Sequence, residues 1–463
     1  MPNMNLKKVK MLEADPNIRN KNFEEVAKGY TLEQAIEEST RCLNCKHKPC
    51  VNGCPVNVPI PEFIKQVSLG NLSEAYKIIA QENALPAICG RVCPQESQCE
   101  GLCVRAIKGE SVGVGRLERF VADYYMDNYQ ETQNEITKNK IKVAVIGSGP
   151  AGITCSKELA KKGYDVTIFE ALHQTGGVLS YGIPEFRLPK KLVQKEIQLV
   201  KDLGVKIECN VIVGRSITID ELQKEGYQAI FIGSGAGLPR FMGIPGENLN
   251  GVYAANEYLT RVNLMKAYKF NTYATPVETG ARVAVIGGGN VAMDAARTAK
   301  RLGATEVYII YRRGEDELPA RLEEIHHAKE EGIIFKLLVN PIKINDNGNG
   351  WIKSIECVEM ELGEPDESGR AKPRVKKDSQ FTLEIDTIIE AIGQSPNPLI
   401  RQTTPGLDIT SWGGIIVDEE TMKTSKDLVY AGGDAVTGAA TVILAMGSGK
   451  TAAKAIDLKL KNK

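Results

Sequence analysis

The sequence lacks any long apolar run and any excess of charge of one sign. None of its apolar stretches approaches the roughly 18–20 residues that a membrane-spanning helix requires. Lysine plus arginine and aspartate plus glutamate both number 58, so the formal net charge is zero. We therefore expect neither a membrane nor nucleic acid among the partners, because a nucleic-acid-binding protein usually carries a basic surface.

The first 20 residues also lack the apolar core of a secretory signal peptide, and no low-complexity tract occurs along the chain. Apolar residues make up 42% of the sequence, which is ample for packed globular cores. A length of 463 residues predicts roughly three domains. We therefore expect a cytoplasmic protein with several folded domains.

Cysteine is unevenly distributed, since eight of the 11 cysteines lie between Cys42 and Cys103. A disulfide scaffold is typical of small secreted chains, whereas this chain is large and has no export signal. The clustered cysteines therefore indicate a metal centre. Their spacings are Cys42-x2-Cys45-x4-Cys50-x3-Cys54-Pro55, then Cys89-x3-Cys93-Pro94, then Cys99-x3-Cys103.

These spacings favour iron–sulfur clusters over zinc. Short loops between thiolates suit a cubane cluster, and in two-cluster ferredoxins the cysteine before proline ligates the other cluster. By that rule Cys42, Cys45 and Cys50 share one cluster, and Cys54 belongs to a second. Structural zinc is the alternative, because C-x2-C is common to zinc sites. Zinc sites usually pair two such knuckles, and the second cysteine group contains none.

Helical periodicity dominates about the first 130 residues, and alternating strands and helices follow. Thr31 and Gln34 have the form of a capping box at a helix start. The polar stretch from Asp127 to Lys140 is predicted to be a linker. From Ile141 onwards, continuously apolar runs indicate parallel strands buried on both faces. Between about Pro341 and Ile385 an alternating pattern predicts antiparallel strands.

The strand Val143–Ile146 leads into a G-x-G-x-x-G motif, which predicts a dinucleotide site. Its glycines permit a tight turn, a close approach to a pyrophosphate, and close helix–sheet packing. The helix N-terminus then offers free N–H groups to the phosphates. Glu170 closes the next strand 23 residues after Gly147, where its carboxylate can accept hydrogen bonds from a ribose. The motif residues predicted to bind are Gly147, Gly149, Pro150, Ala151 and Gly152.

A second glycine motif follows the strand Val283–Ile286, with alanine in the place of the third glycine. The next strand, Glu306–Tyr311, ends in Arg312 and Arg313 rather than in an acidic residue. Guanidinium groups attract a 2′-phosphate, which a carboxylate would repel. The second unit is therefore predicted to bind NADPH rather than NADH. Its motif residues are Gly287, Gly288, Gly289, Asn290 and Val291.

Two dinucleotide units predict two cofactors, FAD and NADPH. A strand near the C-terminus ends in Gly433-Asp434, and a helix is expected to begin near Thr441. This arrangement places a carboxylate and helix N–H groups near the ribityl–pyrophosphate of a flavin. We therefore assign FAD to the first unit, with C-terminal segments completing it and the NADPH unit inserted.

The predicted fold class is α/β, with two Rossmann-like dinucleotide-binding domains and an N-terminal α-helical iron–sulfur domain. The expected domains are residues 1–139 with two [4Fe-4S] clusters, residues 140–250 and 386–463 with FAD, and residues 251–385 with NADPH.

Taken together, the motifs resemble those of the glutamate synthase small-subunit family over essentially the whole chain. The family includes the large subunit of NADH-dependent reduced ferredoxin:NADP⁺ oxidoreductase, and the NADPH-oxidising half of dihydropyrimidine dehydrogenase is similar. The resemblance implies an NADPH-dependent oxidoreductase with FAD and iron–sulfur clusters. It rests on the two cysteine groups, Gly147–Gly152, Tyr181-Gly182-Ile183-Pro184, Gly287–Asp294 and Ala431–Asp434, in this order.

The resemblance also implies how the clusters are ligated. The second cluster would use one non-cysteine ligand, a glutamine or glutamate, which carries over to Glu118 and leaves Cys89 unligated. Counting alone would instead use all eight cysteines, and a plain surface glutamate is the alternative role for Glu118. The implied ligands are Cys42, Cys45, Cys50 and Cys103 for one cluster, and Cys54, Cys93, Cys99 and Glu118 for the other.

Further cofactor contacts are implied by the same resemblance. The segment from Arg312 to Ala320 is family-like and follows the NADPH-binding strand. Family-like stretches also contribute Gly177, Val178, Gly182, Gly235, Gly433, Asp434 and Thr441 to the FAD site, and Asp294 and Glu317 to the NADPH site.

Three functional readings follow. In the first, the chain is the bifurcating-flavin subunit of an NADH-dependent reduced ferredoxin:NADP⁺ oxidoreductase, with ferredoxin and a second flavin and iron–sulfur subunit as partners. In the second, it is the small subunit of NADPH-dependent glutamate synthase and serves a large subunit. The third is a flavin thiol–disulfide reductase or an iron–sulfur sensor. No cysteine pair exists beyond Cys103, which argues against the reductase. The N-terminal pattern Asp15-Pro16-x2-Arg19 resembles the ferredoxin-linked branch, which we therefore favour.

Overall fold

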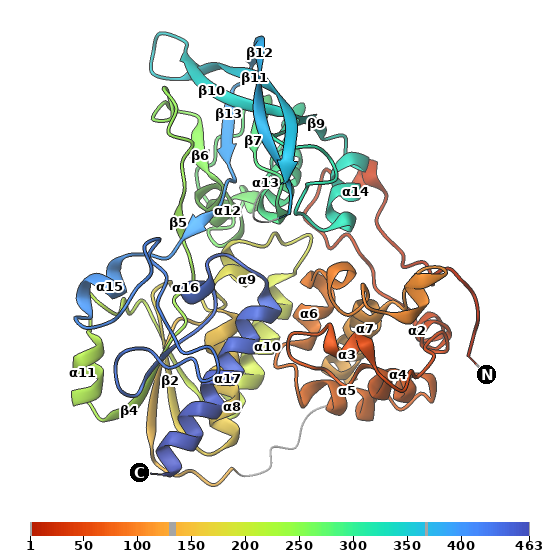
Figure 1. The fold of residues 1–463 in the computed structure, drawn as a ribbon, viewed down its shortest axis with the longest axis vertical. Helices are drawn as coiled ribbons and strands as arrows, with labels where there is room; N and C mark the ends of the chain where they lie inside the picture. The colour runs from red at the N-terminus through yellow and green to blue at the C-terminus, as the bar shows by residue number, and fades with distance from the viewer. Residues whose placement is uncertain (1, 129–135, 366–368, 463) are drawn as a thin grey trace.

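The structure, a computed structural model, describes residues 2–128, 136–365 and 369–462. Within these ranges the chain forms a helical N-terminal domain, two five-stranded parallel sheets with helices, and a projecting antiparallel sheet (Figure 1). Residues 129–135, half of the predicted linker, lie outside the described ranges. None of the described helices is both long and apolar enough to cross a membrane.

The N-terminal domain packs short helices around an apolar centre. The predicted capping box is present, because Thr31 Oγ1 accepts from the Gln34 N–H and Gln34 Oε1 accepts from the Thr31 N–H. Phe63, Ile79 and Leu117 are fully buried between the helices. The helices are α2 (Leu32–Ser39), α3 (Pro49–Asn52), α4 (Ile60–Ser68), α5 (Leu72–Ala80), α6 (Pro86–Val92) and α7 (Val114–Asn128).

The first parallel sheet has the strand order β15-β4-β1-β2-β3. The C-terminal strand β15 pairs with β4, as predicted for a unit completed by the end of the chain. On one face the helices α8 (Pro150–Lys161) and α17 (Val442–Lys461) pack against each other and towards the helical domain. The strands are β1 (Lys142–Ile146), β2 (Asp165–Glu170), β3 (Lys206–Cys209), β4 (Tyr227–Ile232) and β15 (Val429–Ala431).

The second parallel sheet has the order β6-β13-β7-β8-β9. Its strand β13 (Thr387–Glu390) pairs with β7 (Arg282–Ile286), so the sheet continues beyond residue 385, where a domain boundary was expected. A boundary after β13 fits the pairing better, because a strand belongs to the sheet that satisfies its hydrogen bonds. The other strands are β6 (Val252–Ala254), β8 (Glu306–Tyr311) and β9 (Ile334–Leu337).

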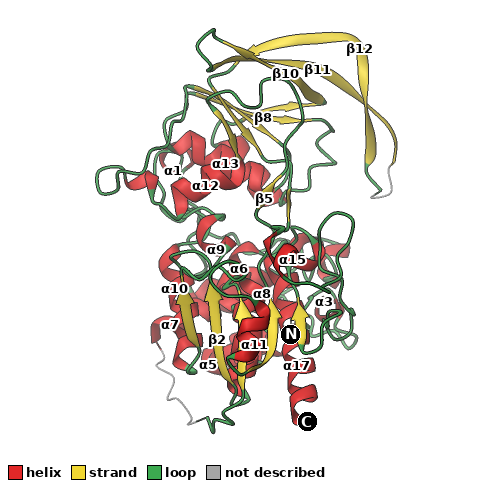
Figure 2. Cartoon of the chain, turned by 90° about the vertical axis from the view of Figure 1, so that its left-hand side faces the viewer, coloured by secondary structure: helices red, strands yellow, loops and turns green. Residues whose placement is uncertain are grey.

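The antiparallel strands predicted between Pro341 and Ile385 form an arm on this second unit. They are β10 (Val339–Asp346), β11 (Ile352–Pro365) and β12 (Ala371–Glu384), in that order. Figure 2 shows β11 and β12 extending away from the parallel sheet. A short antiparallel pair, β5 (Leu238–Pro239) with β14 (Gln394–Ser395), links the two parallel-sheet units.

The N-terminal segment leaves the helical domain and crosses to α14 (Leu322–Glu330) of the second unit (Figure 1). Asp15 caps the short helix α1 (Pro16–Arg19), which presents Arg19 to two carboxylates. Arg19 Nε lies 2.9 Å from Glu331 Oε1, and Arg19 Nη2 lies 2.7 Å from Glu330 Oε2. These contacts hold the helical domain against the second unit.

Candidate electron-transfer site

The first group of predicted cluster ligands surrounds an apolar cavity in the helical domain. Cys42 and Cys45 follow α2, Cys50 lies in α3, and Cys103 precedes a short 3-10 helix. All four line the cavity together with the apolar side chains of Ile60, Ile64, Val112 and Val114. Burial raises the pKa of the Cys50 thiol to about 12, and the neighbouring thiols of Cys42 and Cys103 add to the rise. The structure therefore brings these four cysteines around one space, although Cys103 lies far along the sequence from the other three.

The second group is more deeply placed. Cys93 and Cys99 are buried, and the carboxyl group of Glu118 on α7 points inward rather than to solvent, with the residue 8% exposed. Burial raises the pKa of Cys54 to about 11, and the charges of the nearby Glu118 and Cys93 contribute. Burial likewise raises the pKa of Glu118 to about 7. A plain surface glutamate does not match this placement.

Asn83, which sequence reasoning missed, connects Glu118 with Cys89. Its Nδ2 donates to Glu118 Oε1 at 2.8 Å, and the Cys89 thiol lies 3.6 Å from its Oδ1. Cys89 is 1% exposed, and its sulfur lies 3.5 Å from Met446 Sδ on α17. Cys89 thus lies close to the second group, and which of Cys89 and Glu118 is the eighth ligand stays a prediction.

The described cysteines do not form a tight trio of the kind that a zinc site needs. Tetrahedral zinc with bonds of about 2.3 Å holds its sulfurs roughly 3.8 Å apart. Among the described residues, no three cysteine sulfurs lie within 4.8 Å of one another; the group that meets this distance is Glu13, His327 and Glu330. Four thiols that line one cavity suit a cubane, whose own atoms fill the space between them.

The first glycine motif has the backbone that a dinucleotide requires. Gly147 has φ +97°, and a Cβ on Gly152 would lie 2.0 Å from the Gly147 carbonyl oxygen. At Gly149, the N-cap of α8, a Cβ would meet no atom within 4 Å, so the space above the helix N-terminus is open. A pyrophosphate would lie there, on the free N–H groups of Ala151 and Gly152, which follow Pro150 in the first turn of α8.

Glu170 ends β2 beside this motif. Its Oε2 accepts hydrogen bonds from the Ser148 N–H at 2.9 Å and from the Ser148 hydroxyl at 2.5 Å, and its Oε1 accepts from the Leu172 N–H. The Ser148 hydroxyl in turn accepts from the Gly176 N–H at 2.9 Å. Glu170 therefore anchors the glycine loop in this structure, and its contact with a ribose stays a prediction.

The other predicted FAD residues meet around the same space. A Cβ on Gly177 would lie 3.0 Å from Gly149 Cα, so only glycine fits between the two motifs. Burial, together with the carboxylates of Asp434 and Glu170, raises the pKa of Tyr181 to about 12. Thr441 caps α17, and burial raises the pKa of Asp434 to about 6. Val178 begins the short helix α9 (Val178–Tyr181), Gly182 ends it, and Gly235 and Gly433 both adopt positive φ.

The second glycine motif joins β7 to α13 (Asn290–Arg301). Gly287 has φ +137°, and a Cβ on Gly288 would lie 2.8 Å from both Tyr311 and Leu318. A Cβ on Gly289 would meet only Pro319, at 4.0 Å, and Val291 is 41% exposed. The N-terminus of α13 is thus accessible to a second pyrophosphate, as predicted for NADPH.

Asp294 and Glu317, both predicted to bind NADPH, differ in their partners in this structure. Both oxygens of Asp294 accept from Arg187 Nη1 at 2.7 Å, in a buried pair between α13 and the first unit. Glu317 Oε2 is buried without a hydrogen-bond partner among the described residues. Arg187 lies 107 residues from Asp294, so no local sequence signal pointed to this pair.

The two arginines that follow β8 differ in their exposure to solvent. Arg312 is exposed, whereas Arg313 is 6% exposed and its Nε donates to the Ala371 carbonyl oxygen on β12 at 2.9 Å. Arg313 thus holds the antiparallel arm, and Arg312 is the guanidinium available at the surface of the strand end.

We therefore expect Arg312→Ala to lower the preference for NADPH over NADH by about 10–100-fold, because a charged hydrogen bond contributes roughly 1.5–3 kcal/mol. The measurement is the ratio of kcat/KM for the two nucleotides with an artificial acceptor. Arg313→Ala is the comparison and should change this ratio less. Equal ratios in Arg312→Ala and the native chain would remove Arg312 from the phosphate site.

Comparisons with known proteins agree with this architecture. Residues 19–130 match the family described as dihydropyrimidine dehydrogenase domain II, 4Fe-4S cluster. Residues 141–456 match the pyridine nucleotide-disulphide oxidoreductase family. Among solved structures, FprA from Mycobacterium tuberculosis in complex with NADPH has a TM-score of 0.58 at 20% identity, covering 70% of this chain and 85% of that one. At this identity the likeness concerns the fold.

Curated relatives extend over nearly the whole chain. The glutamate synthase [NADPH] small chain of Azospirillum brasilense is 36% identical over 96% of this chain and 93% of its own length. The NADP(+)-dependent formate dehydrogenase subunit beta of Moorella thermoacetica is 39% identical over 89% of this chain, which spans 60% of that subunit. The chain belongs to the glutamate synthase small-subunit family and is an NADPH-dependent oxidoreductase with FAD and iron–sulfur cofactors.

Proposed function

We propose that this chain is an electron-transfer subunit that exchanges hydride between NADP(H) and FAD and passes single electrons through two [4Fe-4S] clusters. The observation that carries the proposal is a contact with the flavin unit beside the second cysteine group. Cys89, which lies close to this group although it is expected to be unligated, has its sulfur 3.5 Å from Met446 Sδ on α17, the helix whose N-terminus Thr441 caps. The second cluster would therefore lie beside the flavin site.

The order of the carriers follows from burial. Cys93 and Cys99 of the second group are buried and Cys54 is partly buried, whereas all four cysteines of the first group are only partly buried. Electrons would pass from the flavin to the buried cluster and then to the one nearer the surface. We also propose that the ligand sets and domain limits are those predicted from the sequence, with the second unit extended to include β13.

The protein's own contribution is binding, orientation and electrostatics. Bound FAD supplies the exchange of a hydride for single electrons. The glycine loops would hold both dinucleotides at helix N-termini, and Asp434 and Glu170 lie close enough to Tyr181 of α9 to raise its pKa. The Arg187–Asp294 pair fixes the orientation of the two dinucleotide-binding units relative to each other.

For the full reaction we favour the bifurcating-flavin subunit of an NADH-dependent reduced ferredoxin:NADP⁺ oxidoreductase, with ferredoxin and a second flavin and iron–sulfur subunit as partners. Its support is the resemblance of the N-terminal region. Part of that pattern has a structural explanation, because Asp15 caps α1 and Arg19 enters the interface with α14. The second candidate is the small subunit of glutamate synthase, favoured because three such chains are covered over 93–94% of their lengths.

One assay separates the two candidates. The native complex is purified with its partner and supplied with NADPH, NAD⁺ and oxidised ferredoxin. The bifurcating function predicts ferredoxin reduction that depends on NAD⁺. Activity only with glutamine and 2-oxoglutarate would contradict it and support the glutamate synthase function.

A further inference from the structure

Arg321 connects the nucleotide unit to the loop that carries a ligand of the second cluster. It follows the family-like segment Arg312 to Ala320, and the proposed function gives Arg321 itself no role. The residue is 7% exposed, and its guanidinium leaves α14 to reach the helical domain. There Nη1 donates to the Arg91 carbonyl oxygen at 2.8 Å, and Nη2 donates to Gln95 Oε1 at 2.9 Å.

These two acceptors belong to residues two positions before and two positions after Cys93. Gln95, which accepts from Arg321, also bonds the backbone before Cys93. Its Nε2 donates to the carbonyl oxygens of Cys89 at 3.2 Å and Gly90 at 3.4 Å. The Cys89 carbonyl also accepts from the Cys93 N–H at 3.1 Å. The guanidinium is therefore bonded to the backbone turn that positions Cys93.

Backbone hydrogen bonds of Arg321 and of the next residue also hold the arginine in place. Its backbone N–H donates to Asn290 Oδ1 at 3.0 Å, at the start of α13 in the second glycine motif. The next residue, Leu322, donates its N–H to Glu96 Oε1 at 3.1 Å. Two carboxylates face the guanidinium, Glu323 at 3.1 Å from Nη2 and Glu96 at 3.6 Å from Nε.

We propose that Arg321 is a positioning residue that favours reduction of the second cluster through its buried positive charge; the inference rests on the cluster assignment in the proposed function. Reduction adds one negative charge to a cluster. A fixed guanidinium nearby stabilises that charge, and its removal leaves Glu96 and Glu323 uncompensated beside the cluster. At an effective dielectric constant of about 20, a unit charge roughly 10 Å away changes an equilibrium constant about tenfold.

The test is a redox titration of the full chain with reconstituted clusters, followed by electron paramagnetic resonance of each cluster. Arg321→Met removes the charge and the donors while keeping a long side chain. It should lower the reduction equilibrium constant of the cluster bound to Cys93 about tenfold, or about 59 mV for a one-electron couple. The other cluster should be unchanged.

Two further variants make the test specific. Glu96→Gln keeps an acceptor for the Leu322 N–H but removes a negative charge, so it should shift the same cluster in the opposite direction. Arg261→Met, at an arginine of α12 (Ala255–Asn263) that pairs with Glu257, should leave both clusters unchanged. If Arg321→Met fails to assemble its clusters, the sign of the Glu96→Gln shift decides.

Unchanged potentials in Arg321→Met and Glu96→Gln, or equal shifts in both clusters, would overturn the inference. A native chain that assembles only one cluster would instead contradict the proposed function. The iron content and the signals of the native protein therefore separate the two failures.

Discussion

Replacement of Glu118 by alanine is expected to lower the iron content from about eight to about four atoms per chain, because each [4Fe-4S] cluster needs four protein ligands. The Glu118 carboxyl is buried on α7 beside Cys54 and Cys99, and Asn83 orients it through a 2.8 Å hydrogen bond. Alanine at this position leaves three thiolates, because Cys89, although close by, is expected to stay unligated. The measurement is iron per chain after anaerobic purification, together with the spectrum of the remaining cluster.

Two variants serve as controls for this experiment. Glu118→Gln keeps an oxygen donor of nearly the same shape and should retain about eight irons. Cys89→Ala should also retain them, because Cys89 is expected to be unligated. Loss of a cluster in Cys89→Ala, with full iron content in Glu118→Ala, would show that Cys89 is the eighth ligand.

A second prediction concerns stability. Glu331→Gln should lower the free energy of unfolding by about 3–5 kcal/mol. The Glu331 side chain is fully buried and pairs with three guanidinium groups. Arg19 comes from the helical domain, whereas Arg297 and Arg301 come from α13, so the carboxylate joins two parts of the chain. Neutralising Glu331 leaves three buried guanidinium groups without enough negative charge to balance them.

Glu330 supplies a matched control one residue away. It pairs with Arg19 at 2.7 Å, but its side chain is 51% exposed. Glu330→Gln should therefore cost about 0–1 kcal/mol, as for exposed ion pairs. The comparison uses urea unfolding of the three proteins, followed by circular dichroism. Equal midpoints for Glu331→Gln and Glu330→Gln would contradict a central role for Glu331.

The same carboxylate predicts a dependence on pH. The surrounding guanidiniums hold the pKa of Glu331 well below its ordinary value of 4.5, although burial acts in the opposite direction. A carboxyl group whose pKa is lower in the folded than in the unfolded state stabilises the protein. This stabilisation is complete above the unfolded-state pKa and is lost as the pH falls towards the folded-state pKa. The native chain should therefore lose stability below about pH 4.5 more steeply than Glu331→Gln.

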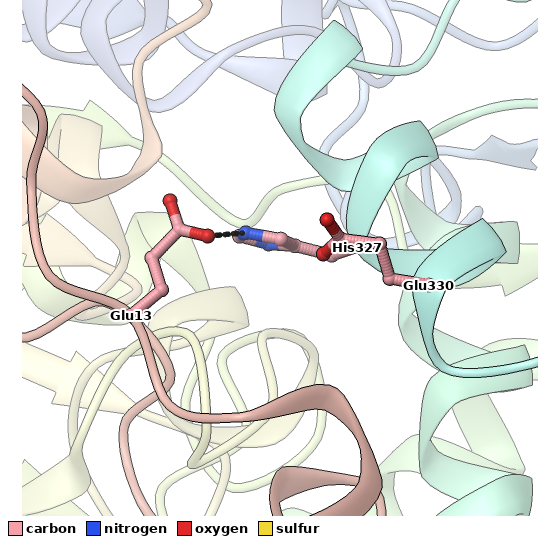
Figure 3. A group of neighbouring side chains, drawn as sticks. All are labelled: Glu13, His327 and Glu330. Carbon is pink, nitrogen blue, oxygen red and sulfur yellow. Dashed lines mark hydrogen bonds and ion pairs between the residues drawn. The ribbon is translucent and has the colours of Figure 1, made fainter.

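Glu13, His327 and Glu330, beside this interface, resemble a metal site, but no metal site should be assigned to them. Figure 3 shows Glu13, His327 and Glu330 with their ligand atoms close together, and Glu13 Oε2 lies 3.1 Å from His327 Nε2. Arg19 is within 3.9 Å of Glu13 and 2.7 Å of Glu330. A guanidinium therefore already supplies the positive charge that a metal ion would bring.

Local features of the fold could be predicted from the sequence, because their signals lie within a few residues. The capping box at Thr31, the glycine turns at Gly147 and Gly287, and the strands before them depend on short-range geometry. The grouping of Cys103 with Cys42 came from a family resemblance, and the structure places both on one cavity. Family membership and fold class are confirmed by the comparisons.

Contacts between distant segments could not be predicted in this way. Arg19 and Glu331 are 312 residues apart, and Arg321 and Gln95 are 226 residues apart. The apolar run that becomes β13 suits either sheet, since both consist of buried parallel strands, so only pairing with β7 assigns it. Arg312 is exposed and Arg313 is buried, a difference that two adjacent arginines in the sequence do not reveal.

The central claim is that electrons from NADPH reach two iron–sulfur clusters through FAD within this one chain. The most direct measurement is an anaerobic titration of the purified, reconstituted chain with NADPH, observed by flavin absorbance and by electron paramagnetic resonance. Our account predicts bleaching of the flavin and two distinguishable [4Fe-4S] signals, provided that a dithionite step brings low-potential clusters into view. Flavin bleaching with only one cluster signal after full reduction, or no response of the flavin to NADPH, would contradict it.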